Sequence, residues 1–289
     1  MLQPMTYTAA AKDSGRMVKH LLADRFSLSR RTITRLKQNG GILLNGQAAA
    51  LTAVVKENDV LTIVWTEQDR AKAQRIAVTP EILYQDESLI IVNKPYGMPC
   101  HPSKEHPDDD MVTLLKKYLN LDAPLHPVGR LDKDVSGIMV YALTARAASR
   151  LSKAREEHGY LKEYEALIEG IPETKEGLLE TFASKDGKMH RMRYDPQGQR
   201  CLTEYSVLKE YENYSLVKVR LKTGRTHQIR FTFSHYGHPL SGDPLYGHKT
   251  PGIYRPALHC FHVAFRHPFK EKTIDLTAPL PEDMADLVL

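Results

Sequence analysis

The chain has 289 residues, of which 42% are hydrophobic and 26% charged, so it can bury a core and is not intrinsically disordered. No apolar run reaches the roughly 18 residues that span a bilayer, and no secretory signal is visible, so we expect a cytoplasmic protein with no membrane partner. Its three cysteines, Cys100, Cys201 and Cys260, are widely spaced. This pattern indicates reduced thiols and excludes a disulfide framework.

The net charge of +5 is unevenly placed along the chain. Residues 12–65 hold nine Lys/Arg and four Asp/Glu, and the two signs balance over the rest. This placement favours a small N-terminal module that binds a polyanion. The alternative is that a surplus of this size is ordinary for a short domain, and charge alone does not decide between the two.

Two helices are expected in this N-terminal segment. Val18, Leu21 and Leu22 have helical spacing. Ser29 is a suitable N-cap for a second helix that runs through Lys37 and ends at the Gly-Gly pair that follows. In the second helix Ile33 and Leu36 would point inward, opposite a face that carries arginines.

Short strands are expected after the helices. The string ILLNGQ at 42–47 is a strand entering an Asn-Gly turn, and DVLTIVW at 59–65 is rich in β-forming residues. This order, with the string LSRRTITRLKQNGGILLNGQ, resembles the S4-type RNA-binding domain, in which a two-helix face binds structured RNA. The resemblance implies that Arg30, Arg31 and Arg35 contact RNA phosphates, which supply affinity but little sequence selectivity.

The polar, weakly patterned residues 66–79 predict a linker. It would join an S4-type module at 12–65 to a larger domain at 80–289. In the larger domain we expect strands at 89–94, 138–143, 163–170, 204–211 and 214–221. We expect three helices: one at 111–118, one that begins after a cap at Thr144, and one that begins after a cap at Thr226 and ends at Gly237. Many strands with few helices predict an α+β fold built on a largely antiparallel mixed sheet.

The stretch GRLDKDVSG at 129–137 contains the first candidate for chemistry. Four charged residues crowd the segment from Arg130 to Asp134, and a buried strand follows directly. A charged loop set against a buried strand can hold a catalytic carboxylate rigidly, and Asp132 is our candidate. The alternative, a solvated surface turn, is favoured when this motif is considered alone.

A second candidate lies in LKTGRTHQIRFTFSHYGHPLSGDPLYG at 221–247. The expected helix puts Ile229 and Phe233 on a core face and Arg230 on a neighbouring face. A buried arginine needs a carboxylate partner. Asp132 is a candidate, and pairing would keep it ionised as a nucleophile must be. A purely structural ion pair remains the alternative.

Tyr164 and the histidines are two further candidates. Tyr164 lies on an expected strand, where an aromatic residue is usually part of the core. The chain has 13 histidines, but neither a His-Glu-x-x-His helix nor a Cys-x-x-Cys pair, so we expect no metal site.

Four strings together resemble the RluA family of pseudouridine synthases. They are VNKPYGMPCHPS at 92–103, HPVGRLDKDVSGIMVYA at 126–142, KEYEALIEG at 162–170 and the string at 221–247. They occur in the family's order over about 200 residues. The resemblance implies the family's catalytic fold and an isomerisation of uridine to pseudouridine in RNA.

Carried over residue by residue, the resemblance assigns four roles. Asp132 matches the catalytic aspartate, and Arg130 matches the arginine that enters the RNA stack and holds the target nucleotide out. Tyr164 matches the tyrosine that stacks on the flipped uracil, and Arg230 matches the basic partner of the aspartate. His227, beside Arg230, is expected to contact RNA.

The family's commonest string, His-Arg-Leu-Asp, is altered here because Gly129 replaces the histidine. That histidine is not thought to perform the chemistry, so we expect activity to persist while the loop's contacts with RNA differ. The reaction detaches uracil at N1 and rejoins it through C5, so no cofactor is required. The aspartate can attack ribose C1′ or uracil C6, or deprotonate C2′, and these routes stay open.

Other functions remain as alternatives. A catalytically silent RNA-binding assembly factor would share the fold, but the intact Asp132, Tyr164 and Arg230 argue against it. A glycosidase-like hydrolase would need a second carboxylate about 5–10 Å from Asp132, and only Asp134 is near in sequence. The S4-type module favours large-subunit ribosomal RNA as the partner, with transfer RNA as the alternative target. A monomer is the default expectation.

Overall fold

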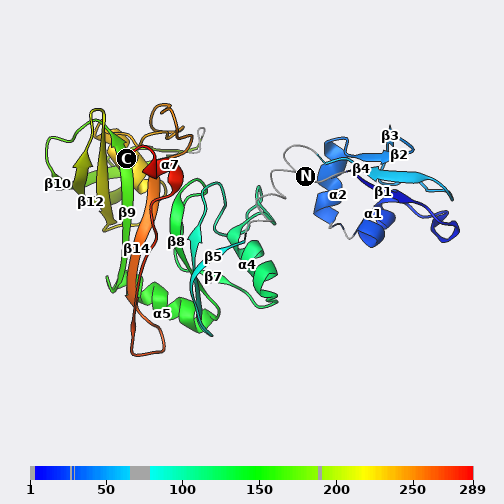
Figure 1. Cartoon of the computed structure of the whole chain (residues 1–289), viewed down its shortest axis with the longest axis horizontal. Helices are drawn as coiled ribbons and strands as arrows, with labels where there is room; N and C mark the ends of the chain where they lie inside the picture. Colours follow the sequence, from blue (N-terminus) through cyan, green and yellow to red (C-terminus); the bar gives the residue numbers. More distant parts are fainter. Residues whose placement is uncertain (1–3, 27, 29, 66–78, 188–190, 289) are drawn as a thin grey trace. The chain divides into compact units, whose positions relative to one another are not determined.

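The computed structural model describes residues 4–26, 28, 30–65, 79–187 and 191–288. The chain divides into two compact units, Met1–Val78 and Thr79–Leu289 (Figure 1). The expected linker at 66–79 lies outside the described residues except for Thr79. Each unit is therefore described by itself.

The small unit contains two helices and a four-stranded sheet. Its elements are β1 (Met5–Thr8), a 3-10 turn (Ala11–Asp13), α1 (Val18–Phe26), α2 (Arg30–Gln38), β2 (Ile42–Leu44), β3 (Gln47–Ala48) and β4 (Val60–Ile63). The strands pair in the order β1-β4-β2-β3, and all three pairings are antiparallel. Leu21, Leu22, Ile33 and Leu36 are buried in its core, which confirms the inward faces expected for both helices.

The Asn-Gly turn of the small unit is confirmed. Asn45 and Gly46 have φ values of 51° and 78°, the left-handed conformations that a tight hairpin turn requires. The unit begins earlier than the expected residue 12, because β1 pairs with β4 from Met5 opposite Ile63. A four-residue strand with a partner so distant in sequence carries little local signal.

The large unit is built on one extensive sheet. Its strands are β5 (Glu81–Gln85), β6 (Leu89–Lys94), β7 (His126–Pro127), β8 (Ser136–Ala142), β9 (Tyr160–Glu169), β10 (Glu176–Asp186), β11 (Arg191–Tyr194), β12 (Gln199–Glu210), β13 (Tyr214–Leu221), β14 (Leu258–Arg266) and β15 (Thr273–Thr277). Its helices are α4 (Met111–Leu119), α5 (Ala145–Glu156), α6 (Gln228–His235) and α7 (Glu282–Ala285).

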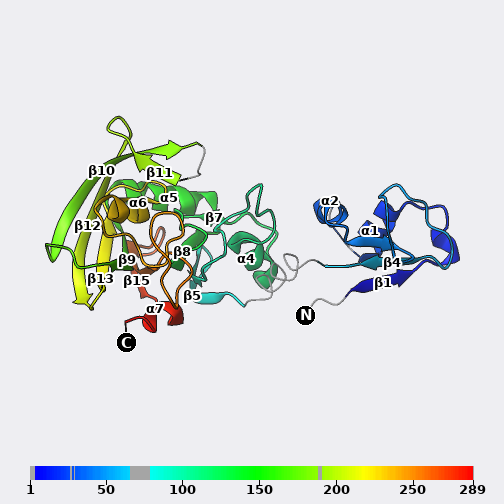
Figure 2. The same ribbon diagram turned by 90° about the horizontal axis from the view of Figure 1, so that it is seen from above.

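The strands of this sheet follow the order β11-β10-β12-β13-β9-β14-β8-β6-β5, and β15 and β7 pair with β14 and β8. Among the described strands, every pairing is antiparallel except that of β8 with β14. The α+β fold with a largely antiparallel mixed sheet is thereby confirmed. In Figure 2, α6 lies within the curve formed by β10, β12 and β13.

Local sequence signals account for the elements around the centre of the sheet. All seven residues of β8 are buried, as its continuous hydrophobic run predicts. The Thr144 side chain accepts a hydrogen bond from the Ala147 N–H, so the expected cap of α5 is confirmed. Asp110 caps α4 in the same way. None of the helices in the described residues is long and apolar enough to cross a membrane.

The start of α6 differs from the expectation, and the predicted Thr226 cap is wrong. The helix begins at Gln228, and His227 before it has a left-handed φ of 51°. That conformation places the chain so that the Gln228 side chain accepts from the Arg225 N–H instead. Gly237, with a φ of 84°, follows the end of the helix as expected.

The parallel pairing of β8 with β14 brings two backbones unusually close. Gly137 lies opposite Cys260, and a Cβ on Gly137 would lie 2.3 Å from the Cys260 carbonyl oxygen. Its φ of 115° also suits only glycine. The loop that precedes β8 is therefore held tightly over the centre of the sheet.

Candidate active site

Cys100 anchors the loop that precedes β8. The Leu131 N–H donates to Cys100 Sγ at 3.3 Å, and the thiol donates to the Leu131 carbonyl at 3.2 Å. Cys100 is buried, so these contacts lie in the protein interior. They fix the backbone immediately before Asp132.

Lys94, at the end of β6, supports the other side of the same loop. Its side chain is fully buried, and its ammonium donates to the carbonyls of Pro95, Met98 and Lys133 at 2.9, 2.8 and 3.1 Å. Burial lowers the pKa of Lys94 to about 8. The three carbonyl oxygens satisfy the buried ammonium and tie their backbone segments together. One of them belongs to Lys133, the residue after Asp132.

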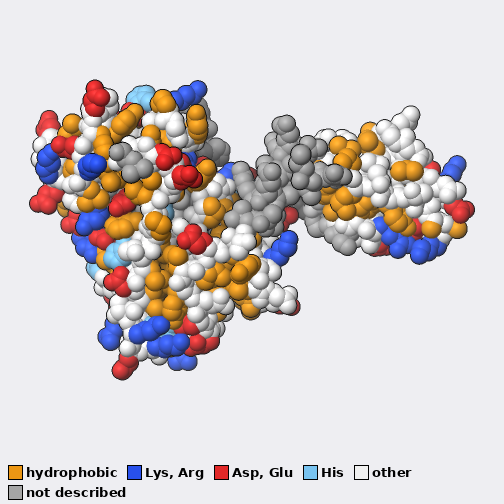
Figure 3. Space-filling view, in the orientation of Figure 1, with side chains coloured by type: hydrophobic (Ala, Val, Ile, Leu, Met, Phe, Trp, Pro, Cys, Tyr) orange, Lys and Arg blue, Asp and Glu red, His pale blue; other side chains and the backbone are white. Residues whose placement is uncertain are grey.

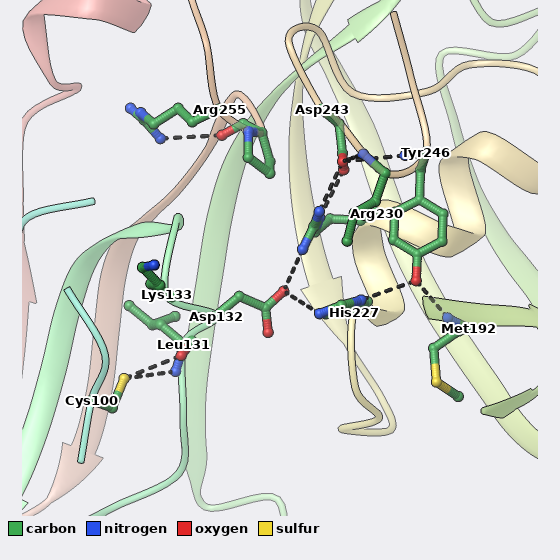
Figure 4. Close-up of polar contacts among 12 residues, drawn as sticks. Cys100, Leu131, Asp132, Lys133, Met192, His227, Arg230, Asp243, Tyr246 and Arg255 are labelled. Carbon is green, nitrogen blue, oxygen red and sulfur yellow. Dashed lines mark hydrogen bonds and ion pairs between the residues drawn. The ribbon is translucent and has the colours of Figure 1, made fainter. Parts of the chain in front are cut away.

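Asp132 faces an arginine from α6. Arg230 Nη1 lies 3.3 Å from Asp132 Oδ2, and the Arg230 side chain is 6% exposed while that of Asp132 is 22% exposed. Arg230 also donates through Nε and Nη2 to both oxygens of Asp243, at 2.7 and 2.8 Å (Figure 4). Burial opposes the guanidinium charge, but these carboxylates outweigh it and raise the pKa of Arg230.

The expected pairing of Asp132 with Arg230 is present, but it is not the principal one. Asp243 is fully buried and holds Arg230 in a bidentate ion pair. Two carboxylates therefore share one guanidinium, and the partly exposed Asp132 is the one accessible from outside. A permanent positive charge therefore lies beside the accessible carboxylate of Asp132.

His227 approaches the same carboxylate from the residue before α6. Its Nε2 lies 3.8 Å from Asp132 Oδ2, and its Nδ1 lies 3.0 Å from the Tyr246 hydroxyl. That hydroxyl accepts from the Met192 N–H at 2.6 Å, which leaves its own proton for His227 Nδ1 (Figure 4). Burial lowers the pKa of His227, so we assign a neutral ring with its proton on Nε2, facing Asp132.

A pocket of about 240 Å³ opens above Asp132. It is lined by Pro99, Cys100, His101, Ser103, Arg130, Leu131, Asp132, Lys133 and His227. Arg130 is exposed. The pocket therefore combines one carboxylate with several cationic or polar groups, a composition that suits a polyanionic substrate.

Tyr164 is not among the residues that line this pocket. It is 6% exposed, and it sits on β9 opposite Val219 of β13. Lys162 Nζ is 5.5 Å from the centre of its ring. Burial raises its pKa, and the charge of Asp132 contributes, so the two residues are electrostatic neighbours.

The structure thus brings together Asp132, Arg230, His227 and Arg130, with Tyr164 buried nearby. The side chains of Arg30, Arg31 and Arg35 lie outside the described residues, although their backbones belong to α2.

Sequence reasoning missed three residues of the site: Asp243, Tyr246 and Lys94. Asp243 and Tyr246 share the Gly- and Pro-rich string HPLSGDPLYG, where a lone acid in an ordered loop was an available signal. Lys94 follows the hydrophobic run LIIVN directly, and a cation at the end of a buried strand is the signal there. No group of metal-ligating side chains occurs within the part of the chain that the structure describes.

Comparisons with known proteins identify the family of this chain. The model of the RNA pseudouridylate synthase family matches residues 88–235. YjbO of Bacillus subtilis (strain 168), named an uncharacterized RNA pseudouridine synthase, is 35% identical over 273 residues, which cover 92% of this chain and 96% of that protein. The ribosomal large subunit pseudouridine synthase D of Zymomonas mobilis is 32% identical over 280 residues, 89% of this chain and 88% of that protein.

One solved structure has a similar fold over most of this chain. Human RNA Pseudouridylate Synthase Domain Containing 4 aligns with a TM-score of 0.61 and 25% sequence identity. The alignment covers 75% of this chain and 94% of that one.

Proposed function

The chain belongs to the RNA pseudouridylate synthase family and is an RNA pseudouridine synthase, and from this premise we propose that it modifies a uridine of large-subunit ribosomal RNA with Asp132 as its nucleophile. Relatives named for that ribosomal subunit, at about 30% identity over most of the chain, support the target. A transfer RNA uridine is the alternative that the experiment below distinguishes.

The observation that carries the role of Asp132 is its shared guanidinium. Arg230 is oriented by Asp243 and presents its remaining nitrogen to Asp132 at 3.3 Å. The charge beside the nucleophile is therefore in place before the substrate arrives, which is the preorganisation that lowers a reaction barrier. Asp132 is partly exposed within the pocket, so its carboxylate can meet a base delivered from outside.

The uridine must leave its helix to reach this carboxylate. Flipping a base costs a few kcal/mol, and Arg130, exposed at the rim of the pocket, would fill the space that the base vacates. Stacking on Tyr164 would recover on the order of 1–3 kcal/mol. We propose that the flipped uracil enters between the loop of Asp132 and the strand that carries Tyr164.

His227 completes the proposed site by approaching the same oxygen of Asp132 that Arg230 contacts. A neutral ring with a proton on Nε2 donates toward the carboxylate or toward a substrate oxygen that enters between them. The detached uracil has to rotate before C5 bonds to the sugar, and a neutral donor can hold it without fixing its orientation by charge. His227 is thus assigned to contact the RNA substrate.

We assign the small unit to RNA capture as an S4-type domain. Its two helices and antiparallel sheet are compatible with that assignment, and α2 carries Arg30, Arg31 and Arg35. A separate basic module would add affinity for structured RNA without choosing a sequence. The choice of uridine would then rest with the larger unit.

The decisive experiment maps pseudouridines in total RNA from a gene-deletion strain by carbodiimide adduct formation and primer extension. We expect one or more sites in large-subunit ribosomal RNA to disappear. The wild-type gene and the control variant Asp134→Asn, which alters a carboxylate in the same loop, should restore them, whereas Asp132→Asn should not. Loss of a transfer RNA site instead would redirect the target, and full restoration by Asp132→Asn would refute the role of Asp132.

A further inference from the structure

Arg155, in the last turn of α5, packs against the glycine that begins the loop of Asp132. A Cβ on Gly129 would lie 3.2 Å from Arg155 Cζ and 3.3 and 3.4 Å from its two terminal nitrogens. These nearly equal distances mean that the plane of the guanidinium faces the glycine. Gly129 has a φ of 81°, and it leaves the space that the guanidinium occupies.

The other cations of α5 are engaged within the protein. Arg146 and Arg150 lie over the ring of Phe269, at 5.5 and 4.7 Å, and Lys153 lies 3.6 Å from Glu157. Figure 3 shows Lys and Arg side chains gathered at the end of the large unit that carries α5 and the turn between β14 and β15. These contacts explain their positions without any RNA.

No contact of this kind explains the position of the Arg155 side chain. Its side chain is exposed, and within the described ranges no carboxylate or aromatic ring is in contact with its guanidinium. The positive charge of Arg155 acts on two buried tyrosines. Burial raises the pKa values of Tyr160 and Tyr164, and the charge of Arg155 opposes that rise. Arg155 therefore lies against Gly129 and within electrostatic range of Tyr164.

Arg130 is the residue after Gly129, is also exposed, and lines the pocket. Two arginines thus flank a single glycine at the edge of the site, and neither is neutralised by a carboxylate among the described residues. Two exposed cations beside one glycine offer a polyanion two points of attachment. A planar guanidinium also matches the oxygens of a phosphate.

We propose that Arg155 binds a backbone phosphate of the RNA strand beside the flipped uridine, and that Gly129 is required because it makes room for this contact. The inference deepens the proposed function and rests on it. It also gives a physical reason for the departure at Gly129, where the resembling family most often has histidine. A side chain at this position would displace the guanidinium, so the arginine contact replaces whatever the histidine does elsewhere.

The test measures affinity as a function of salt concentration, with the full-length chain and with large-subunit ribosomal RNA purified from the deletion strain as the probe. A lost phosphate contact reduces the slope of log K against log salt by about 0.7–0.9. We expect Arg155→Ala to show this reduction and to weaken binding about fivefold at 0.1 M salt, uniformly across RNA sequences. Arg155→Lys should retain most of the slope because it keeps the charge.

Two further variants separate binding from packing. Lys153→Ala removes an equal charge from another face of the same helix, and it should leave the slope unchanged. Gly129→Ala should reproduce the loss seen in Arg155→Ala, and the double variant should lose no more than either single one. Melting temperatures of all variants check that each remains folded, because a side chain at the positive φ of Gly129 strains the backbone.

The outcomes distinguish this inference from the proposed function. If Arg155→Ala binds with the wild-type slope, or if Lys153→Ala loses as much, the phosphate contact is refuted although the enzyme remains a pseudouridine synthase. If Gly129→Ala and Arg155→Ala add independently, the role of Gly129 is refuted. If every pseudouridine of this RNA is still present in the deletion strain, the proposed target is refuted, whatever the binding data show.

Discussion

Arg230 donates two hydrogen bonds to Asp243, at 2.7 and 2.8 Å, and only one, at 3.3 Å, to Asp132. Asp243 is itself held, because its Oδ1 accepts from the N–H groups of Leu245 and Tyr246. The arginine is therefore oriented by a fully buried carboxylate and not by Asp132, the proposed nucleophile. This leaves Asp132 free to react while the charge beside it stays in place.

Asp243→Asn should lower both activity and stability. Loss of the charge leaves a buried guanidinium with one partly exposed partner, and breaking a buried ion pair costs about 3–5 kcal/mol. We expect kcat to fall about tenfold to a hundredfold, as when a group that orients a catalytic residue is removed. Tritium release from RNA labelled at uridine C5 measures kcat, and urea unfolding measures stability.

The chain offers a matched control in a second bidentate pair. Arg255 donates to both oxygens of Asp283, at 2.7 and 2.8 Å, and neither residue lines the pocket. Asp283→Asn should also reduce stability, by a smaller amount because the Asp283 side chain is 23% exposed whereas that of Asp243 is fully buried. It should leave kcat at the wild-type value under conditions where the variant is folded. An equal loss of kcat in both variants would show that stability alone explains the effect.

Lys94→Met should lower kcat more than it raises KM. The substitution keeps the length and apolar stem of the side chain but removes the donor that three carbonyls share, so the backbone beside Asp132 loses its anchor. Because burial lowers the pKa of Lys94 to about 8, the ammonium becomes neutral above that pH. Wild-type kcat should therefore decline from about pH 8 upward.

That alkaline decline separates a positioning role from simple packing. Lys94→Met has no group to titrate, so its reduced kcat should stay level across the same pH range. A decline of equal size in the variant would assign the effect to another group. A variant with wild-type kcat throughout would remove Lys94 from any role in the site.

His259 should make stability depend on pH between about 6.5 and 4. Its ring is buried and its Nδ1 lies 2.9 Å from Ser136 Oγ. Burial lowers the pKa of His259 from 6.5 to about 4, so the unfolded chain binds a proton in this range before the folded chain does. Stability is therefore retained above pH 6.5 and lost as pH falls toward 4, by on the order of 3 kcal/mol.

The variant His259→Asn isolates this contribution from the other titrating groups. It should be less stable than wild type at pH 7, but its stability should fall less as the pH decreases to 4. Urea unfolding at several pH values measures the difference. Parallel curves for the two proteins would contradict the assignment.

Removal of residues 1–78 should weaken RNA binding and flatten its salt dependence, while the large unit keeps its fold. The two units are separate by their internal contacts, and the N-terminal segment carries the chain's charge surplus. Filter binding over a range of salt concentrations measures the effect, and circular dichroism checks the fold. Joint substitution of Arg30, Arg31 and Arg35 by Ala should reproduce most of the loss. Unchanged affinity would refute the capture role.

Local patterns in the sequence predicted the elements that depend on local physics. The buried strand at 89–94, the Asn45–Gly46 turn, and the Thr144 cap all occur as expected. Hydrophobic runs, left-handed turn residues and side-chain caps act over a few neighbouring residues, so one stretch of chain contains the whole signal. Four ordered strings likewise identified the family, since together they specify one catalytic domain.

The sequence by itself determined the α+β fold, the family and the candidate residues Asp132, Arg230 and Tyr164. Only the tertiary structure decided which of these touch, that Asp243 is the principal partner of Arg230, and that Arg155 packs against Gly129. Each of these contacts joins segments that meet only when the sheet has formed. Any buried carboxylate satisfies a guanidinium equally well on electrostatic grounds, so the choice between Asp132 and Asp243 is made by the geometry of the folded sheet.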